Sequence, residues 1–433
     1  KEYEFIHATY NEVISKNNKI DLQINLTENE KTYVERINLY GNFITEEKVI
    51  RNSLIVDEGD AFNEILLNKS INNIKARNIF KNVSKTIQEG SSKAHKIINI
   101  EVEEKPTGEI SAGAGTGTSG SVVSVGIKES NYLGRGIGLN TNLAISDTSI
   151  QGLFSINNPN YKNSDKSLNT TVESSTSDYM SRFGYKNKRH GFSMGTYYEQ
   201  FKDIYFSPSI SNYYETLETS SSASAAKKKQ EGSYLDSQFK YGLTLNKLNQ
   251  NFQPSDGYRS SFNQTLPIYS DDFAIINSYE LSNYFSFNEN AIFSFNFFVK
   301  AANSLTGEDV RVTKRVFIPG RKLRGFELGK IGPVDGGDFI GGNYGSVVNL
   351  ITSFPNLFPE LQNIDFNIFV DAANVWGVDY DSSLDKSKLR SSTGIGIDWY
   401  TPIGPLSFSL AVPLSKANTD KTETFRFNIG TTF

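Results

Sequence analysis

The sequence predicts a transmembrane β-barrel of about 16 antiparallel strands, preceded by a small α+β module. Segments in which apolar and polar side chains alternate recur from Pro106 to the end of the 433-residue chain. The mean hydropathy is −0.40, and no apolar run reaches the roughly 18 residues of a membrane helix. These values exclude helical spans but not a barrel, because alternation cancels the average. The chain also stops on an aromatic residue within an alternating strand.

The terminal segment Thr424–Phe433 is the clearest of these strands. Successive side chains of a strand point to opposite sides, so one face is apolar and the other polar. An aromatic residue near the end of such a strand is typical of an outer-membrane barrel, whose aromatic girdles lie at the lipid interfaces. The alternative is the edge strand of a soluble sandwich. The apolar face holds Phe425, Phe427, Ile429 and Phe433, and the polar face holds Arg426, Asn428, Gly430 and Thr432.

Residues 31–106 are predicted to form the α+β module, with the order β-α-α-β-β. Thr45 is expected to cap the first helix, which ends at Ser53. The second helix has Leu67, Ile71 and Ile74 at helical spacing, which gives one buried stripe. The expected strands are Tyr33–Leu39, Phe80–Gln88 and Ile97–Glu103, and the second helix is Asp60–Ala76.

Residues 1–30 contain two further predicted strands, Phe5–Thr9 and Ile20–Leu26, without helices of their own. We interpret them as the C-terminal remnant of a preceding copy of the same module. The chain opens on Lys1 with neither an initiator Met nor a signal peptide, which indicates a mature or truncated chain.

Residues 107–433 are predicted to form the barrel. The stretch from residue 109 to the end numbers 325 residues. Strands of about 10 residues, with connections of about 10, give roughly 16 strands, an even number as closure requires. Separate soluble sandwiches are the alternative, but no break divides the stretch into such units.

Two connections in this region are unusually long. Ser207–Glu231 is polar, includes a Ser/Ala-only segment and a lysine run, and is expected to be a solvated extracellular loop without a binding role. Pro319–Gly345 is rich in glycine and contains the sequence Arg321-Lys322-Leu323-Arg324-Gly325-Phe326.

The composition argues against covalent and metal chemistry. No cysteine is present, which excludes disulfides, thiol catalysis and thiolate metal sites, and fits either a reducing compartment or a cell-envelope protein. His7, His95 and His190 are not spaced as a metal pair, and a serine near His190 is expected by chance. Neither a Gly-x-Ser-x-Gly motif nor a phosphate-binding loop occurs. The net charge of −4 gives no general attraction to nucleic acid. We therefore expect no catalytic residue, no metal and no cofactor.

Several motifs, in the expected order along the chain, resemble the BamA family, the central subunit of the outer-membrane protein assembly machinery. The module at residues 31–104 is similar to that family's membrane-proximal POTRA domain. Leu323-Arg324-Gly325-Phe326 resembles the family's VRGF motif. The other matching segments are Ile331-Gly332-Pro333, Pro254-Ser255-Asp256-Gly257-Tyr258, Phe369 to Trp376, and Gly394 to Trp399 with Gly404-Pro405-Leu406.

The resemblance implies that the loop tip Leu323–Phe326 docks inside the barrel. Asp371 lies on the strand face opposite Phe366, Ile368 and Val370, hence toward the lumen if those side chains face lipid. A two-point contact with the Arg324 guanidinium is expected. A carboxylate that merely lines a watery lumen is the alternative. The family's glutamate on the neighbouring strand is replaced here by Asn349.

The resemblance also implies a lateral gate between the first and last barrel strands. The first strand has glycines at alternate positions, which weaken strand packing. Gly430 is expected to be the point where the last strand parts from its neighbour. A strand thinned to accommodate a bulky lumen is the alternative. The expected gate residues are Ile110, Ser111, Gly113, Gly115, Phe425, Phe427, Gly430 and Phe433.

The function implied by the resemblance is the folding and insertion of client barrels as part of a BAM complex, without covalent chemistry. The expected location is the Gram-negative outer membrane, with the POTRA domain in the periplasm. The expected partners are unfolded outer-membrane proteins, accessory lipoproteins bound through the POTRA domain, periplasmic chaperones and the lipid bilayer, and not nucleic acid. Alternatives are a translocation pore of the two-partner secretion or TamA-like type and a passive porin.

Overall fold

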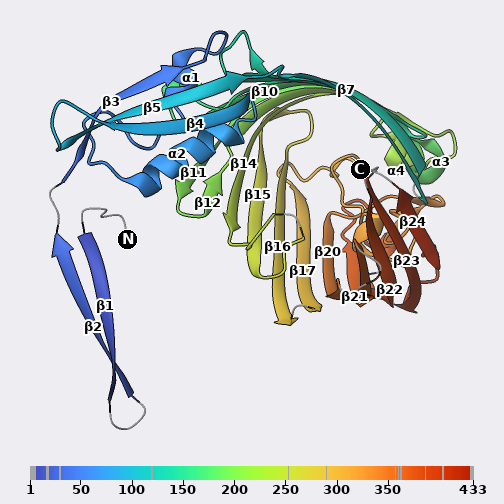
Figure 1. Ribbon diagram of the computed structural model, residues 1–433. Helices are drawn as coiled ribbons and strands as arrows, with labels where there is room; N and C mark the ends of the chain where they lie inside the picture. Colours follow the sequence, from blue (N-terminus) through green and yellow to red (C-terminus); the bar gives the residue numbers. More distant parts are fainter. Residues whose placement is uncertain are drawn as a thin grey trace. The chain divides into compact units, whose positions relative to one another are not determined.

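The computed structural model divides the chain into two compact units, which are described separately (Figure 1). Unit 1 comprises residues 1–109, 128–139 and 158–165, and unit 2 comprises residues 110–127, 140–157 and 166–433. The structure describes residues 6–15, 19–28, 31–118, 120–251, 253–288, 290–355, 357–358, 360, 363–385, 387–401 and 404–429.

Unit 1 begins with an antiparallel hairpin and continues with the α+β module. The hairpin strands are β1 (Ile6–Ser15) and β2 (Lys19–Glu28). The module consists of β3 (Tyr33–Tyr40), α1 (Glu47–Arg51), α2 (Glu64–Ala76), β4 (Phe80–Glu89) and β5 (His95–Glu104). Its sheet has the order β3-β5-β4, with β3 parallel and β4 antiparallel to β5. The predicted order β-α-α-β-β is therefore correct.

The module has its own hydrophobic core. The apolar stripe of α2, made by Leu67, Ile71 and Ile74, packs with Ile98 and Ile100 of the central strand β5. Asn63 caps α2 by accepting a hydrogen bond from the Leu66 amide. Burial of this stripe is the main stabilising contribution to the module, because a helix of this length is marginal in isolation.

The predicted role of Thr45 as a helix cap is wrong. α1 begins only at Glu47, and the preceding N-cap residue Glu46 makes no side-chain capping bond. The Thr45 hydroxyl instead accepts a hydrogen bond from Asn131, and its amide donates to the Glu104 carboxylate at 2.6 Å. The competing tertiary bonds thus replace the local cap.

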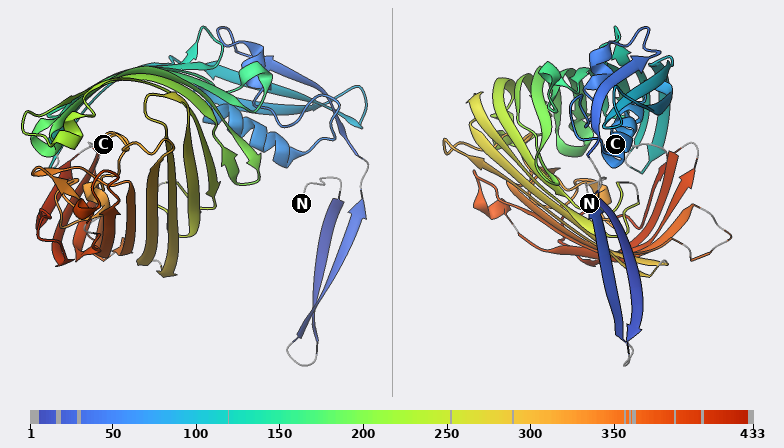
Figure 2. Two further views of the ribbon diagram at one scale, coloured as in Figure 1. Left: turned by 180° about the vertical axis from the view of Figure 1, so that it is seen from behind. Right: turned by 60° about the vertical axis from the view of Figure 1, so that its left-hand side comes forward.

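Unit 2 is a closed antiparallel β-barrel, which can be followed by colour from teal to dark red in Figure 2. Seventeen labelled strands form it, and β12 and β13 are two pieces of one strand, so the described chain makes a barrel of 16 strands, as predicted. The strands are β6 (Gly108–Gly117), β7 (Gly120–Tyr132), β8 (Ile137–Ser146), β9 (Ser149–Asn158), β10 (Ser167–Tyr179), β11 (Tyr185–Phe201), β12 (Ile204–Phe206), β13 (Ser209–Thr219), β14 (Gly232–Asn246), β15 (Gly257–Ser270), β16 (Ala274–Asn288), β17 (Ala291–Ser304), β20 (Tyr344–Phe354), β21 (Ile364–Trp376), β22 (Arg390–Thr401), β23 (Gly404–Ser415) and β24 (Phe425–Ile429).

The interpretation of Ser207–Glu231 as one long loop is wrong in its first half. β13 occupies Ser209–Thr219 and pairs with both β11 and β14, so it is part of the barrel wall. The true connection is Ser220–Glu231, with the short helix α4 (Ala225–Lys228) inside it. Lys227 of α4 is buried and donates hydrogen bonds to the Phe183 carbonyl and the Asp338 carboxylate.

The strand β21 shows how the two faces of the barrel wall differ. On β21, Ile368 and Val370 are exposed, whereas Asn367, Phe369 and Asp371 on the opposite face are buried. Among the described residues, no helix has the length and apolar character needed to cross a membrane. The remaining short elements are α3 (Met180–Phe183), η1 (Tyr161–Asn163), η2 (Gly320–Lys322), η3 (Ser382–Leu384) and the two-residue strands β18 (Val334–Asp335) and β19 (Asp338–Phe339).

Candidate functional site

The long connection between β17 and β20, residues 305–343, packs against the inner face of the barrel wall. It is longer than predicted, and its tip contains Leu323, Arg324, Gly325 and Phe326. Leu323 and Phe326 are buried in one cluster with Val347 of β20 and Val375 of β21. The tip is therefore held by apolar packing as well as by the polar contacts described next.

Arg324 forms a two-point ion pair with Asp371. Its Nε lies 2.7 Å from Asp371 Oδ2, and its Nη2 lies 2.7 Å from Oδ1. The Arg324 backbone amide donates a third hydrogen bond to Oδ2 at 3.1 Å. The Asp371 side chain is 0% exposed. This parallel geometry is the strongest form of an arginine–carboxylate contact, and burial protects it from screening by salt.

Three neighbouring side chains complete the environment of this pair. Asn349 lies directly opposite Asp371 in the β20–β21 ladder and donates its side-chain amide to Asp371 Oδ1 at 2.7 Å. Phe369 lies two residues before Asp371 on the same face, and its ring centroid is 3.4 Å from the Arg324 guanidinium carbon. Ser392 of β22 donates to the Arg324 carbonyl at 2.5 Å. Asn349 is a neutral donor, and the carboxylate of Asp371 accepts hydrogen bonds from both sides.

Gly325 permits the sharp turn of the tip. Its φ is +87°, and a Cβ there would lie 3.2 Å from the Cβ atoms of both Ser392 and Ala411. Only glycine adopts this conformation without strain while approaching the wall so closely. The turn directs Phe326 into the buried cluster.

The loop tip is also hydrogen-bonded to the last barrel strand and to the segment before it. Arg426 of β24 donates through Nη2 to the Phe326 carbonyl at 3.0 Å. The backbones pair through Glu327 N to Lys421 O at 3.0 Å and Glu423 N to Gly325 O at 3.2 Å. One tip therefore connects Asp371 on β21 with β24.

The seam between β24 and β6 has few pairing contacts among the described residues. Asn428 pairs with Gly117, and Ile429 pairs with Thr116. In addition, the Thr118 amide donates to the Phe427 carbonyl at 3.0 Å, and Thr118 Oγ1 accepts from the Phe427 amide at 3.0 Å. On its other edge the same strand β24 has five pairs with β23, and β22 has eleven pairs with β23.

The structure places the expected gate residues in different surroundings. Ile110 is 80% exposed, and Ser111 contacts β7 through the Gly126 carbonyl. Gly113 lies opposite Ser124 of β7, and Gly115 is buried. Phe425 and Phe427 stack with ring centroids 5.9 Å apart. The expectations for Gly430 and Phe433 lie outside the described residues.

Gly117 controls how closely the two edge strands approach each other. A Cβ at this position would lie 2.5 Å from the Phe427 carbonyl oxygen and 2.5 Å from Asn428 Oδ1. Real Cβ atoms do not tolerate such a contact, so any larger side chain would push β24 away from β6. Gly117 is not among the gate residues expected from the sequence.

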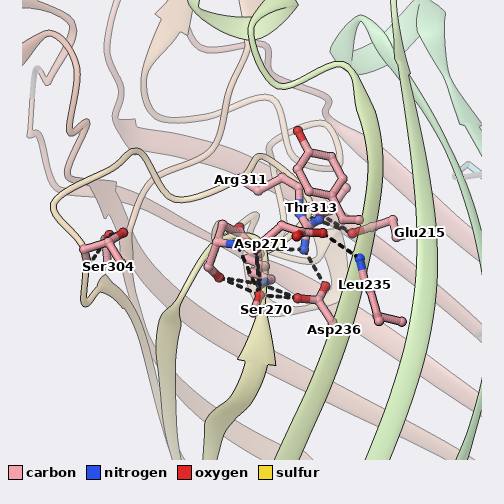
Figure 3. A network of polar contacts seen from close by, with 12 residues as sticks. Glu215, Leu235, Asp236, Ser270, Asp271, Ser304, Arg311 and Thr313 are labelled. Carbon is pink, nitrogen blue, oxygen red and sulfur yellow. Dashed lines mark hydrogen bonds and ion pairs between the residues drawn. The ribbon is translucent and has the colours of Figure 1, made fainter.

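A second anchor of the same loop was not predicted (Figure 3). Arg311 is 2% exposed and donates to Asp236 Oδ2 of β14 at 2.5 Å, with Glu215 of β13 at 3.3 Å. Asp272, in the β15–β16 turn, lies 3.1 Å from Arg311 and 2.5 Å from Lys314 Nζ. Three carboxylates thus surround two loop cations. The loop is bound to β13–β16 by this cluster and to β20–β24 by its tip.

Among the described residues, no group of three or more histidine, aspartate or glutamate side chains is arranged so that it could hold a metal ion. His190 and Ser174 contact each other at 2.8 Å across β10 and β11, and both are exposed. No carboxylate among the described residues pairs with this imidazole.

Two family domains match the chain. Residues 131–433 match the Omp85 superfamily domain, and residues 32–105 match a POTRA domain described as a surface antigen variable number repeat. The outer membrane protein assembly factor BamA of Neorickettsia risticii is 26% identical, with 96% of this chain and 57% of the relative covered. BamA of Neisseria meningitidis serogroup B is 24% identical, with 96% of this chain and 58% of the relative covered. The chain spans somewhat more than half the length of these relatives.

Solved structures show the same fold. BamA from Haemophilus ducreyi lacking POTRA domains 1–3 has a TM-score of 0.81 at 23% identity, covering 100% of this chain and 90% of that chain. CdiB from Acinetobacter baumannii has a TM-score of 0.59 at 11% identity, covering 99% of this chain and 78% of that chain. The predicted fold class and the resemblance to BamA are confirmed. The barrel lies in the bacterial outer membrane, and the POTRA domain lies in the periplasm. The matching domain covers well over half of the residues of this chain, so the chain belongs to the Omp85 superfamily.

Proposed function

We propose that this chain folds and inserts other β-barrels into the outer membrane, with the β6–β24 seam acting as a lateral gate. The observation that carries the proposal is the short pairing at this seam. Each backbone hydrogen bond contributes only about 0.5–1.5 kcal/mol net to stability. All five described residues of β24 pair with β23 and two of them pair with β6, so the described part of this strand is held more weakly on its β6 side.

An opened seam would present unpaired backbone groups to a client strand. From Gly108 to Gly115, β6 has no partner on β24 within the described residues. Unpaired N–H and C=O groups on a strand edge are a template for another strand, and main-chain hydrogen bonds supply the affinity. Lipid-facing Phe425 and Phe427 would guide the apolar face of the incoming strand.

In this proposal the docked loop holds the last strand in register. Arg324 fixes the tip to the wall through Asp371, and the tip binds β24 through Arg426. The residues Leu323–Phe326 thus have a positioning role. The work of insertion comes from pairing of the client backbone and burial of its apolar side chains in lipid, so the chain needs neither a covalent step nor a cofactor.

The proposal extends to domains and partners. Residues 1–30 are the remnant of a preceding POTRA domain, 31–106 the membrane-proximal POTRA domain, and 107–433 the barrel. Unfolded outer-membrane proteins are the clients, with accessory lipoproteins and periplasmic chaperones acting through the POTRA domain. The BamA relatives are named outer membrane protein assembly factors, which supports outer-membrane proteins as the clients.

Crosslinking of a stalled client tests the gate. These 433 residues contain no cysteine, so single cysteines introduced as Ser111→Cys or Phe427→Cys are the only thiols of this chain. We expect both to crosslink to the client's last strand. Ile268→Cys, on the exposed outer face of β15 away from the seam, is the matched control. Crosslinks confined to the lumenal variant Asp398→Cys would contradict the gate and favour a translocation pore.

A further inference from the structure

A basic pocket lies within unit 1, on the α+β module and two adjoining turns. Its cavity volume is about 280 Å³, room for several water molecules at roughly 30 Å³ each. All of its lining residues belong to unit 1. They include Lys48 and Arg77 from the module, Arg135 and Gly136 from the β7–β8 turn, and Asn160 and Lys162 from the β9–β10 connection.

Positive charge dominates this pocket. Four of the lining side chains are cationic and none is acidic. Glu46 is the acidic residue that pairs with two of them, Lys48 and Arg135, the latter at 3.3 Å. Lys162 contacts only the neighbouring Tyr161 ring in the described part of the chain. The local charge is thus about three units positive, because four cations face one carboxylate.

Arg77 is the centre of the pocket. It is half-buried, and burial lowers the pKa of its guanidinium below the usual value. Its Nε donates to the Ser53 hydroxyl at 2.6 Å, and its Nη2 donates to the Asn160 side-chain carbonyl. Both partners are neutral, and no carboxylate of the described residues forms an ion pair with it. A partly desolvated arginine without a counterion is costly unless an anion occupies the site.

We infer that this pocket binds a phosphate group, with Arg77 as the central contact and Lys162, Lys48 and Arg135 around it. The planar guanidinium matches two phosphate oxygens, and the ammonium groups add point charges. The side-chain amide of Asn160 is already held by the Ser164 carbonyl, so its oxygen fixes Arg77 and orients it within the pocket.

The chain topology favours a phospholipid as the source of the phosphate. β6 leaves the periplasmic module, so the β7–β8 and β9–β10 connections lie at the periplasmic ends of their own strands. Leu133 lies two residues before the pocket residue Arg135 and is exposed. Between them, Gly134 is closely approached by the carbonyl of Ile44. Ile44 is exposed and its neighbour Phe43 is 93% exposed. Exposed apolar side chains beside basic ones are typical of a surface that contacts lipid headgroups.

The test uses the full chain, delipidated in a phosphate-free nonionic detergent. Phosphatidylglycerol, diacylglycerol with the same acyl chains, and inorganic phosphate are titrated in separate arms, with bound lipid counted by native mass spectrometry and phosphate binding measured by calorimetry. We expect phosphatidylglycerol to bind at least tenfold more tightly than diacylglycerol. The double variant Arg77→Gln/Lys162→Gln should bind phosphatidylglycerol at least tenfold more weakly than the parent does.

Matched variants keep the outcome interpretable. Lys69→Gln removes an exposed cation from α2 outside the pocket and should bind as the parent does. Lys162→Gln alone breaks no hydrogen bond of the described chain, so it tests the site even if Arg77→Gln does not fold. The lipid source would be overturned if the variants lose phosphate binding but the parent binds phosphatidylglycerol no more tightly than diacylglycerol. The pocket would then be assigned to free phosphate. Unchanged binding of both probes in the variants would overturn the site.

Discussion

Replacing Arg324 by alanine removes the most strongly bound group of the loop tip. The change deletes two charge-assisted hydrogen bonds of 2.7 Å, each contributing about 1.5–3 kcal/mol. It leaves the fully buried Asp371 with one hydrogen bond from Asn349 and one from the backbone amide at position 324. Breaking a buried ion pair in this way costs about 3–5 kcal/mol, since a charge stays behind without its partner. We expect a loss of that size in the free energy of unfolding.

The assay is a double-mutant cycle in reversible denaturant unfolding of the reconstituted chain. Its members are the parent, Arg324→Ala, Asp371→Asn and the double variant. If the two side chains interact as the geometry indicates, the coupling energy should exceed about 1.5 kcal/mol, the lower value for one charged hydrogen bond. Arg321→Ala is the matched control, because Arg321 is an exposed arginine on the same loop and should change stability by less than about 0.5 kcal/mol.

The same variants carry a functional readout. Arg324→Ala should impair client assembly while the POTRA domain remains folded, because the module has a separate hydrophobic core. A coupling energy below about 0.5 kcal/mol, or normal client assembly by Arg324→Ala, would refute the positioning role of the loop.

Three further substitutions test contacts elsewhere in the chain. Gly117→Val should speed hydrogen exchange of the Thr118 amide at least tenfold, because the new Cβ collides with the Phe427 carbonyl that accepts this amide. Gly113→Val is the control: its Cβ meets only Ser124 Oγ at 3.2 Å, so exchange of the Thr118 amide should stay unchanged. Arg311→Ala should cost about 3–5 kcal/mol in denaturant unfolding, because three carboxylates lose their shared cation. Burial would raise the pKa of Glu104, but hydrogen bonds from residues 43–45 outweigh it and hold that pKa below 4.5. The stabilisation from Glu104 is therefore present above the unfolded-state pKa and lost as pH falls through the lowered folded-state value, so the Phe43 amide resonance should titrate below pH 4.5 in the parent and not in Glu104→Gln.

The parts of the fold that could be predicted are those where an element has one apolar and one polar face. On β21, period-two alternation places Asp371 inward and Ile368 outward, as the structure has them. The helix α2 of the POTRA domain could also be predicted, because its apolar stripe packs into a single hydrophobic core. In both cases the local pattern and the tertiary environment agree.

β13 was missed because its inner face carries the apolar Tyr213 and Leu217 beside the polar Ser211 and Glu215. Tyr213 and Leu217 are buried there against the loop and its neighbours, while Ile210 and Tyr214 are exposed outside. With apolar side chains on both faces the alternation disappears, and the Ser- and Asn-rich sequence favours a loop interpretation. Where the docked loop packs against the wall, inward-facing side chains are thus apolar as well as polar.

The Arg311 cluster could not be predicted because its members come from four separate segments. Glu215, Asp236 and Asp272 each resemble ordinary lumenal or turn carboxylates in the sequence. Only the path of the loop brings them within 3.3 Å of one guanidinium. The Arg324–Asp371 contact was anticipated only because a family motif marked both residues.

A disulfide across the seam tests the central claim most directly. Thr116→Cys and Ile429→Cys occupy directly opposed positions, and antiparallel pairs have the separation that a disulfide requires. The matched control joins Thr244→Cys and Ser261→Cys, an opposed pair on β14 and β15 that need not part. We predict that oxidation of the seam pair abolishes client insertion, that reduction restores it, and that the control pair inserts clients in both states. Normal insertion by the oxidised seam variant would contradict the lateral gate.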